Sequence, residues 1–283
     1  MEMVYHDNAY DPFINTFPHK DGLLDLSRVI WSRSVGSLAS DGAFLKSVVH
    51  VNDDVYYLKL SNYDSYRGVF GHESVNECIA CRLGGILGFS VASGILREAV
   101  VVIDGIAYQA HVFISKSFKA IDSRASFEAF YLSHRESPRE SPLDFSIRNG
   151  WKTDILSMFV FDYLIINRDR HGGNIEVLKN GGIRLSPLFD NGLSFVCTCR
   201  DDADIGAFDS ILDRKVNNFI GEQSLEKNLR FIDTKLCFHA LKSEHRKLLF
   251  QDIGGILSQS HMDKIWEIVT VRWKNVEKFR VAR

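Results

Sequence analysis

Two acidic residues and an asparagine in the middle of the chain have the types and the spacing that transfer of a phosphoryl group requires. Asp169 precedes Asn174 by five positions (169 to 174), and Asp190 follows sixteen positions after the asparagine (174 to 190). A carboxylate and an amide oxygen are suitable ligands for a divalent cation such as Mg²⁺, which bridges the phosphates of a nucleotide. A further carboxylate can take the proton of the acceptor hydroxyl. The sequence therefore predicts that Asn174 and Asp190 hold metal and that Asp169 is a catalytic base.

A buried helix and a hairpin are predicted to position these three residues. Asp169 and Asn174 directly follow residues 153–166, an almost wholly apolar stretch that predicts a helix buried on nearly all sides. Between them and Asp190, two short apolar runs joined by Lys-Asn-Gly-Gly (179–182) predict a hairpin. We therefore expect the polar residues at 169–174 and those around Asp190 to face the same opening.

A lysine and a glutamate in the first half of the chain complete the scheme. Lys59 interrupts an apolar strand predicted over residues 55–60, and Glu77 lies on a helix predicted over residues 73–87. Phosphoryl transfer of this kind uses a strand lysine to contact the nucleotide phosphates and a helix glutamate to hold that lysine. Glu73, one turn earlier on the same helix face, is the alternative partner of Lys59.

A polar segment rich in Gly and Ser precedes this strand and is predicted to cover the phosphates of ATP. The backbone N–H groups of such a loop form a concave anion-binding surface. Its candidate ATP-binding residues are Gly36, Ser37, Ser40 and Gly42, with Lys46 just after the loop.

The order of the predicted elements indicates an α+β fold with two lobes. The apolar runs that predict strands in the first half are 44–51, 55–60, 95–102 and 107–114. Residues 1–117 are therefore expected to form an antiparallel β-rich N-lobe with one main helix. Residues 118–283 are expected to form a mostly helical C-lobe, with amphipathic helices at 233–250 and 261–279. ATP is expected in the cleft between the lobes, with its nucleobase bonded to backbone near residues 112–115.

The composition excludes several classes of protein. Hydrophobic residues make up 45% of the 283-residue chain and charged residues 25%, which is typical of a folded globular protein. The formal net charge of -2 provides no overall positive field for nucleic acid or for an anionic membrane. No apolar stretch is long enough to span a bilayer. We therefore expect no direct nucleic-acid partner and no membrane span.

Cysteine usage and the first residues favour a cytoplasmic location. The count of five cysteines is odd, which suits a reducing compartment, and the N-terminal sequence lacks the regions of a signal peptide. The pairs Cys78/Cys81 and Cys197/Cys199 could be zinc thiolates. Because Cys81 lies among the apolar positions of the predicted helix, buried free thiols are the favoured interpretation.

Together these motifs resemble the HipA-like family of bacterial serine/threonine kinases, in particular its short, stand-alone CtkA-like type. This family is related to the protein kinase and phosphatidylinositol kinase fold. Its catalytic pattern Asn-x-Asp-x-His-x-x-Asn matches Asn167, Asp169, His171 and Asn174. Its metal-binding pattern Pro-x-x-Asp matches Pro187 and Asp190, and its Asn-Glu helix motif matches Asn76 and Glu77. The phosphate loop departs from the family's Ser-Gly-x-Gln-x-Lys type, since residues 40–46 keep only its Ser, Gly, Ala and Lys.

The resemblance implies ATP and Mg²⁺ as cofactors and a Ser or Thr hydroxyl of a protein as the acceptor. It also implies autophosphorylation in or near the phosphate loop, for which Ser37 and Ser40 are the nearest candidates. An antitoxin or a host protein is an implied partner, and secretion as an effector is the alternative to a cytoplasmic location.

Several alternatives stay open at the level of sequence. His171 is either a second catalytic group or a residue that holds its turn by hydrogen bonds, and Arg170 is either a substrate contact or a surface charge. Lys59 could instead be an edge-strand lysine. The same core could serve a phosphoinositide or small-molecule kinase, or a catalytically silent module that binds a nucleotide and a partner.

Overall fold

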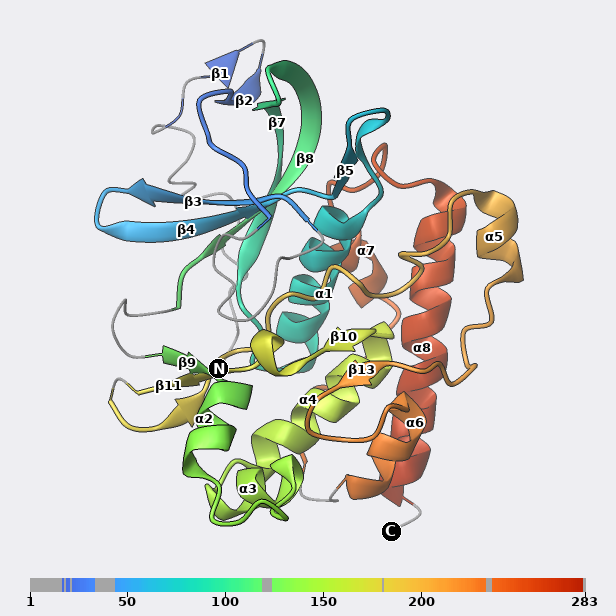
Figure 1. The fold of residues 1–283 in the computed structure, drawn as a ribbon. Coiled ribbons are helices and arrows are strands. Elements are labelled where there is room, and N and C mark those ends of the chain that lie inside the picture. Colours follow the sequence, from blue (N-terminus) through green and yellow to red (C-terminus); the bar gives the residue numbers. More distant parts are fainter. Residues whose placement is uncertain are drawn as a thin grey trace.

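The computed structural model describes residues 17, 19–20, 22–33, 44–118, 124–179, 181–232 and 236–281. These residues form an α+β fold in which a β-rich lobe sits above a mainly helical lobe (Figure 1). The two-lobed architecture predicted from the sequence is confirmed. Its exact boundary after residue 117 stays a prediction, and the predicted phosphate-loop residues Gly36, Ser37, Ser40 and Gly42 lie outside the described residues.

The upper lobe is built on a six-stranded sheet with the strand order β1-β2-β7-β8-β4-β3. Neighbouring strands are antiparallel, except that β2 and β7 are parallel. Its strands are β1 (His19–Lys20), β2 (Leu23–Leu26), β3 (Lys46–Val51), β4 (Asp54–Lys59), β7 (Gly94–Ile103) and β8 (Ile106–Lys116). The last four occupy the apolar runs from which strands were predicted. Asn52 and Asp104 take the left-handed conformation in the two connecting turns, which such short polar residues tolerate.

Helix α1 (Glu73–Leu87) has the predicted bounds and follows a small hairpin of β5 (Asn62–Asp64) and β6 (Gly68–Phe70). Gly88 ends the helix in the left-handed conformation (φ 81°), which glycine adopts without steric cost. The helix packs against β7 and β8, but its apolar side chains belong to the same buried cluster as those of the helical lobe. Helix α1 is therefore held from both lobes.

The lower lobe is organised around α4 (Lys152–Ile165), whose residues from Ile155 onward are almost all buried. It packs against α6 (Leu225–Asn228) and against α8 (Gln259–Val281), which covers the predicted helical segment 261–279. The other helices are α2 (Phe127–His134), α3 (Pro142–Arg148), α5 (Asp202–Ala207) and α7 (His245–Leu249).

Short strands frame the polar loops that follow α4. β11 (Glu176–Leu178) and β12 (Arg184–Leu185) form the predicted hairpin, and β9 (Arg124–Ser126) pairs on the other side of β11. β10 (Asp169–Arg170) pairs in parallel with β13 (Asn217–Asn218), a contact that the sequence did not predict. This second pairing joins the segment after Asp190 to the loop that carries Asp169.

The helix predicted over residues 233–250 is wrong over most of its described part, since residues 236–244 are not helical and α7 begins at His245. The segment instead crosses the end of α1. The N–H of His239 donates to the carbonyl of Leu87, and Phe238 stacks on Phe89 with ring centroids 4.4 Å apart. Its apolar side chains are thus buried by tertiary contacts rather than on one helix face.

Within the described ranges, none of the helices has the length and apolar character needed to cross a membrane.

Candidate active site

Side chains from three separate segments meet at the end of β4. The Nζ atom of Lys59 lies 2.5 Å from Glu77 Oε1 and 3.1 Å from Asp190 Oδ1. Lys59 ends β4, Glu77 lies in the second turn of α1, and Asp190 follows β12. The exposed fraction of these side chains is 13%, 6% and 21%, so the contacts are made largely out of water. Three residues that the sequence predicted to act together are therefore in direct contact.

The charges of this cluster stabilise one another. Burial on its own would lower the pKa of Lys59, but the neighbouring charges of Asp190 and then Glu77 outweigh burial and raise it. Burial would likewise raise the pKa of Asp190, whereas Lys59 and Lys46 lower it well below its ordinary range. The lysine is therefore cationic and Asp190 anionic over the whole physiological range of pH.

Two alternatives for this cluster are settled by its geometry. Strand β4 lies between β3 and β8, so Lys59 is not on an edge strand. The carboxylate of Glu73 accepts the backbone N–H of Asn62 at 3.3 Å, and its burial raises its pKa. Glu77, and not Glu73, is therefore the partner of Lys59.

A second ammonium group contacts the same aspartate. The Nζ atom of Lys46, at the start of β3, lies 2.8 Å from Asp190 Oδ2. The sequence placed Lys46 among the residues that contact ATP, but it did not predict this ion pair. Asp190 is thus held between two cations, one on each of its oxygens.

The donor set near Asp190 fits a magnesium ion. The amide nitrogen of Asn174 donates to the backbone carbonyl of Asp169 at 2.8 Å, which leaves the amide oxygen without a hydrogen bond among the described residues. Mg²⁺ usually takes one or two protein oxygens and completes its shell with water and phosphate. The ionised Asp190 and the free amide oxygen of Asn174 are ligands of that kind.

A zinc site made by the cysteine pairs is not formed. In the part of the chain that the structure describes, no group of three or more His, Cys, Asp or Glu side chains is arranged to hold a metal ion. Cys78 is buried on α1, and burial raises the pKa of its thiol, as expected of an unligated core cysteine.

Asp169 lies on a loop that fixes its position while leaving its carboxylate accessible. Its N–H donates to Asn167 Oδ1 at 3.1 Å, and its Oδ1 accepts a hydrogen bond from Asn217 Nδ2 at 2.9 Å. About a third of the side chain is exposed (30%). The contact from Asn217, which comes from β13, was not predicted, because a two-residue strand leaves no pattern in the sequence.

His171 holds its own turn. Its Nδ1 accepts the backbone N–H of Gly173 at 3.0 Å, so the proton of the neutral ring is on Nε2. That Nε2 lies 3.7 Å from Asp169 Oδ2, which is too far for a hydrogen bond. The contacts favour the positioning role over direct catalysis by His171.

Arg170 is the residue for which both sequence interpretations are wrong. It is 1% exposed, so it is neither a surface charge nor a substrate contact. Its guanidinium donates to the carboxylate of Asp162 on α4, with Nη2 at 2.8 Å, and to the carbonyls of Asn174 and Phe189. Nη2 also donates to Asn191 Oδ1 at 2.7 Å. One buried side chain therefore ties the Asp169–Asn174 loop to the residues on both sides of Asp190.

The sequence did contain a signal for the buried contacts of Arg170. Asp162 is the one carboxylate inside the apolar stretch 155–166, and a buried carboxylate needs a cationic or hydrogen-bonding partner. Arg170 lies eight positions later, beyond the helix end. A search for the partner of Asp162 would have found it.

We expect the Arg170→Met variant to be strongly destabilised, because it leaves the Asp162 carboxylate buried and uncompensated. Breaking a buried pair from one side typically costs about 3–5 kcal/mol of the free energy of unfolding. Urea denaturation followed by circular dichroism measures this. Arg246→Met, which removes an exposed ion pair with Asp263, is the matched control and should change stability little. Equal stability of the two variants would contradict a stabilising role for the buried contact of Arg170 with Asp162.

Helix α1 is also tied to the segment after Asp190. The amide of Asn76 donates to the carbonyls of Gly192 and Ser194, at 3.2 Å each. A Cβ at Gly192 would lie only 3.1 Å from the carbonyl oxygen of Glu73, so glycine permits this close approach. The Asn-Glu pair on α1 thus has two tasks, since Asn76 anchors the segment and Glu77 holds Lys59.

At three of the four residues expected to contact the nucleobase (112–115), the backbone groups are not available. β8 is a central strand, and Phe113, Ile114 and Ser115 pair with β7 on one side and with β4 on the other. Their backbone groups are therefore used within the sheet.

Comparison with known proteins bears on the fold. No protein-family model matches the sequence, and no curated protein matches it either. The crystal structure of the Helicobacter pylori proinflammatory kinase CtkA superposes with a TM-score of 0.60 at 16% identity, over 92% of this chain and 99% of that chain. The chain has the fold of the CtkA kinase. The resemblance to HipA-like kinases that the motifs indicated is thus confirmed at the level of the fold.

Two other solved structures match less closely. HipA of Shewanella oneidensis MR-1, from its complex with HipB and operator DNA, has a TM-score of 0.40 at 16% identity, over 87% of this chain and 68% of that chain. WaaP in complex with acyl carrier protein has a TM-score of 0.39 at 13% identity, over 96% and 94%.

Proposed function

We propose that the protein is an ATP-dependent kinase that transfers the terminal phosphoryl group of Mg-ATP to a Ser or Thr hydroxyl of a protein, including its own chain. The observation that carries the proposal is the contact of Lys59 with both Glu77 and Asp190. This cluster lies beside a loop in which Arg170 fixes Asn174 and in which Asp169 stays accessible. The sequence predicts these roles for Lys59, Glu77, Asp190, Asn174 and Asp169, whereas the contacts of Arg170 are seen only in the structure.

In the proposed reaction the acceptor hydroxyl loses its proton to the carboxylate of Asp169 as its oxygen bonds to the γ-phosphorus. The bond between that phosphorus and the bridging oxygen breaks, and ADP leaves with the electron pair. Lys59 would contact the phosphates, while Glu77 holds its ammonium group in place. Lys46 would supply a second positive charge on the same side.

Asp190 and Asn174 would hold the magnesium ion, which would neutralise charge on the phosphates when bound. Asp190 must then exchange at least one of its two ammonium contacts for the metal. The phosphates offer those ammonium groups a new anionic partner, so the exchange keeps every charge compensated.

Glu77→Gln is expected to lower phosphoryl transfer about tenfold or more, because a neutral amide holds the Lys59 ammonium less firmly than a carboxylate does. Glu73→Gln is the matched control, because Glu73 lies one turn earlier and contacts Asn62 rather than Lys59. Single-turnover transfer from labelled ATP measures both. A larger loss of transfer in Glu73→Gln than in Glu77→Gln would show that Glu77 is not the partner of Lys59.

The proposal is tested by incubating the protein with γ-labelled ATP and Mg²⁺, with a proteome lysate in one arm and mixed phosphoinositides in the other. Label on protein Ser or Thr, lost in Asp169→Asn, is the expected result. Label on lipid alone would favour the lipid kinase alternative. Stabilisation by Mg-ATP without any transfer in either arm would favour a silent nucleotide-binding module.

A further inference from the structure

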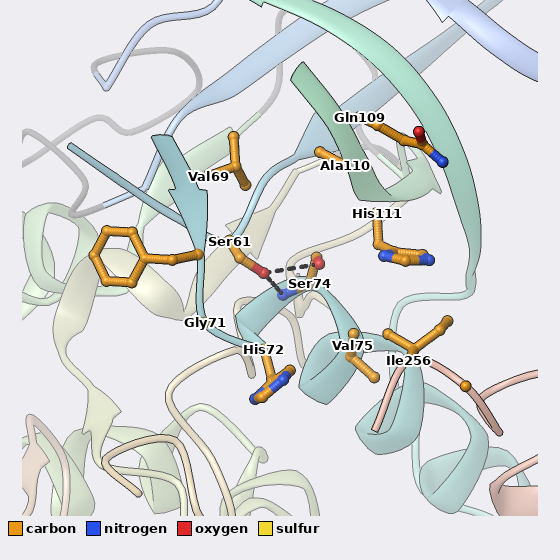
Figure 2. A pocket seen from close by; sticks show the side chains of 12 residues that line it. Ser61, Val69, Gly71, His72, Ser74, Val75, Gln109, Ala110, His111 and Ile256 are labelled. Atoms are coloured by element: carbon orange, nitrogen blue, oxygen red, sulfur yellow. Dashed lines mark hydrogen bonds between the residues drawn. The ribbon is translucent and has the colours of Figure 1, made fainter. Parts of the chain in front are cut away.

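A cavity of about 210 Å³ lies at the start of α1 (Figure 2). Its walls come from β6, from the first turn of α1, from β8 and from the loop that precedes α8. Figure 2 shows Ser61 and Ser74 at its base, their hydroxyls 2.9 Å apart, with His72, His111 and Ile256 around them. Nothing in the proposed kinase reaction uses this cavity.

The chemistry of the lining is unusual. Its apolar part is formed by Val69, Val75, Ala110 and Ile256, and none of the described lining residues is Lys, Arg, Asp or Glu. The ionisable groups that line it are the imidazoles of His72 and His111. The two serine hydroxyls are already engaged with each other.

The imidazoles here have unused hydrogen-bonding capacity. Neither the ring of His72 nor that of His111 forms a hydrogen bond among the described residues. The ring of His261 packs edge-on against His72 with centroids 4.8 Å apart, and its Nε2 is buried without a partner. Half-buried polar groups that lack a partner cost free energy unless a ligand or water satisfies them.

The surroundings of His72 favour the neutral form of its ring. Burial lowers its pKa below the ordinary value, and the nearby His261 and His111 lower it further. The groups that act on its ring are His111 from β8 and His261 from α8, while Asp202 acts on His261 from α5. The carboxylate of Glu73, the next residue on α1, accepts the backbone N–H of His72. Gln109 points its amide to Glu98 at 2.7 Å. No carboxylate is among the described residues that line the cavity, and the carboxylate of Glu73 lies behind Gly71.

These features select one class of ligand. A cation would find no carboxylate, and a phosphate dianion would find no Arg or Lys to neutralise it. A purely apolar molecule would leave the imidazole N–H groups unpaired. A monocarboxylate packs its apolar body against the apolar half of the lining and accepts N–H hydrogen bonds from the imidazoles. Its single charge is neutralised when one imidazole takes up a proton, which a dianion would require twice. The volume exceeds that of cavities of about 150 Å³ that hold benzene.

We propose that this cavity binds a small carboxylic acid with an apolar body, in its carboxylate form, and that its occupancy is coupled to the Lys59–Glu77–Asp190 site. The coupling follows from Ser74, which lines both this cavity and the space between Lys59 and Asp190. A ligand packed on the first turn of α1 holds the helix in the position in which Glu77 reaches Lys59. The coupling rests on the proposed function, whereas the binding does not.

Benzoate is the probe, and benzyl alcohol, of nearly the same shape but without charge, is its control. Calorimetric titration of the full chain should show benzoate binding about tenfold or more tightly than benzyl alcohol, as one charge-assisted hydrogen bond provides. His72→Gln and His111→Gln should each lose most of this preference. His50→Gln, an exposed histidine on β3, should keep it.

The NMR titration of the histidine rings adds an independent readout. Bound carboxylate should raise the pKa of His72, and by linkage the benzoate affinity should increase between pH 8 and pH 6. Equal affinities for benzoate and benzyl alcohol, unchanged affinity in both histidine variants, or no benzoate binding at millimolar concentration would each overturn the site.

A second titration repeats the measurement with Mg-ATP present. We expect benzoate and Mg-ATP each to bind several-fold more tightly in the presence of the other, because coupling between sites is reciprocal. Equal benzoate affinity with and without bound Mg-ATP would overturn the coupling and leave the carboxylate site in place. Failure of Mg-ATP to bind at all would contradict the proposed function instead.

Discussion

Asp169→Asn should reduce the rate of phosphoryl transfer by about a thousandfold while leaving the affinity for Mg-ATP nearly unchanged. A general base contributes about 10²- to 10⁴-fold to such a step, and the amide cannot accept the hydroxyl proton. The fold should tolerate the change, because asparagine has the shape of aspartate and its oxygen can still accept the hydrogen bond from Asn217. Single-turnover kinetics measure the rate, and the shift in melting temperature with Mg-ATP measures binding.

Asp154→Asn is the matched control for this variant. Asp154 is an exposed aspartate in the first turn of α4, and the same chemical change there should leave transfer as it is in the unmodified protein. If Asp169→Asn instead abolished the thermal shift by Mg-ATP, Asp169 would be a metal ligand rather than the base.

Asp190→Ala should abolish both transfer and stabilisation by Mg-ATP. The variant removes the proposed anionic metal ligand and takes the counter-charge from Lys59 and Lys46. Without the metal, ATP should bind no more tightly in the presence of Mg²⁺ than in the presence of EDTA. A ligand at one hundred times its Kd stabilises a protein by about 2.7 kcal/mol, so loss of this stabilisation is readily measured by thermal unfolding.

Asp54→Ala serves as its control, since it removes a surface carboxylate that pairs with Lys116 on the same sheet. It should respond to Mg-ATP as the unmodified protein does. A full magnesium-dependent shift in Asp190→Ala would show that the cation is held elsewhere, and the assignment of Asp190 would then fail.

The components of the site that sequence reasoning predicted are those whose chemistry conflicts with their surroundings. Lys59 is a charge on an apolar strand, and Asp169 and Asn174 are polar residues directly after a buried helix, so each needed an explanation other than packing. The choice between Glu77 and Glu73 could not be made in this way. Both lie on one helix face, and only the contacts in the folded protein, of Glu77 with Lys59 and of Glu73 with Asn62, decide which of them reaches the lysine.

What sequence reasoning missed depends on contacts between distant segments. Arg170 follows the predicted helix as a loop residue, but its partner Asp162 lies on that helix and its other partners lie near Asp190. The pairing of β10 with β13 involves two residues on each strand, too few to show a period. Residues 236–244 carry an apolar pattern that a helix could bury, but α1 and Phe89 bury it instead. Local periodicity contains no information about such partners.

The ion pair of Lys46 with Asp190 has a consequence for the order in which ligands enter. The carboxylate that a cation would need is already neutralised by the chain, so free Mg²⁺ must displace an ammonium group held at 2.8 Å. We expect the protein without nucleotide to be nearly indifferent to magnesium. A triphosphate offers Lys46 a stronger anion and brings its own cation. Nucleotide and metal should therefore enter as one complex, and magnesium alone should not shift the melting temperature of the protein.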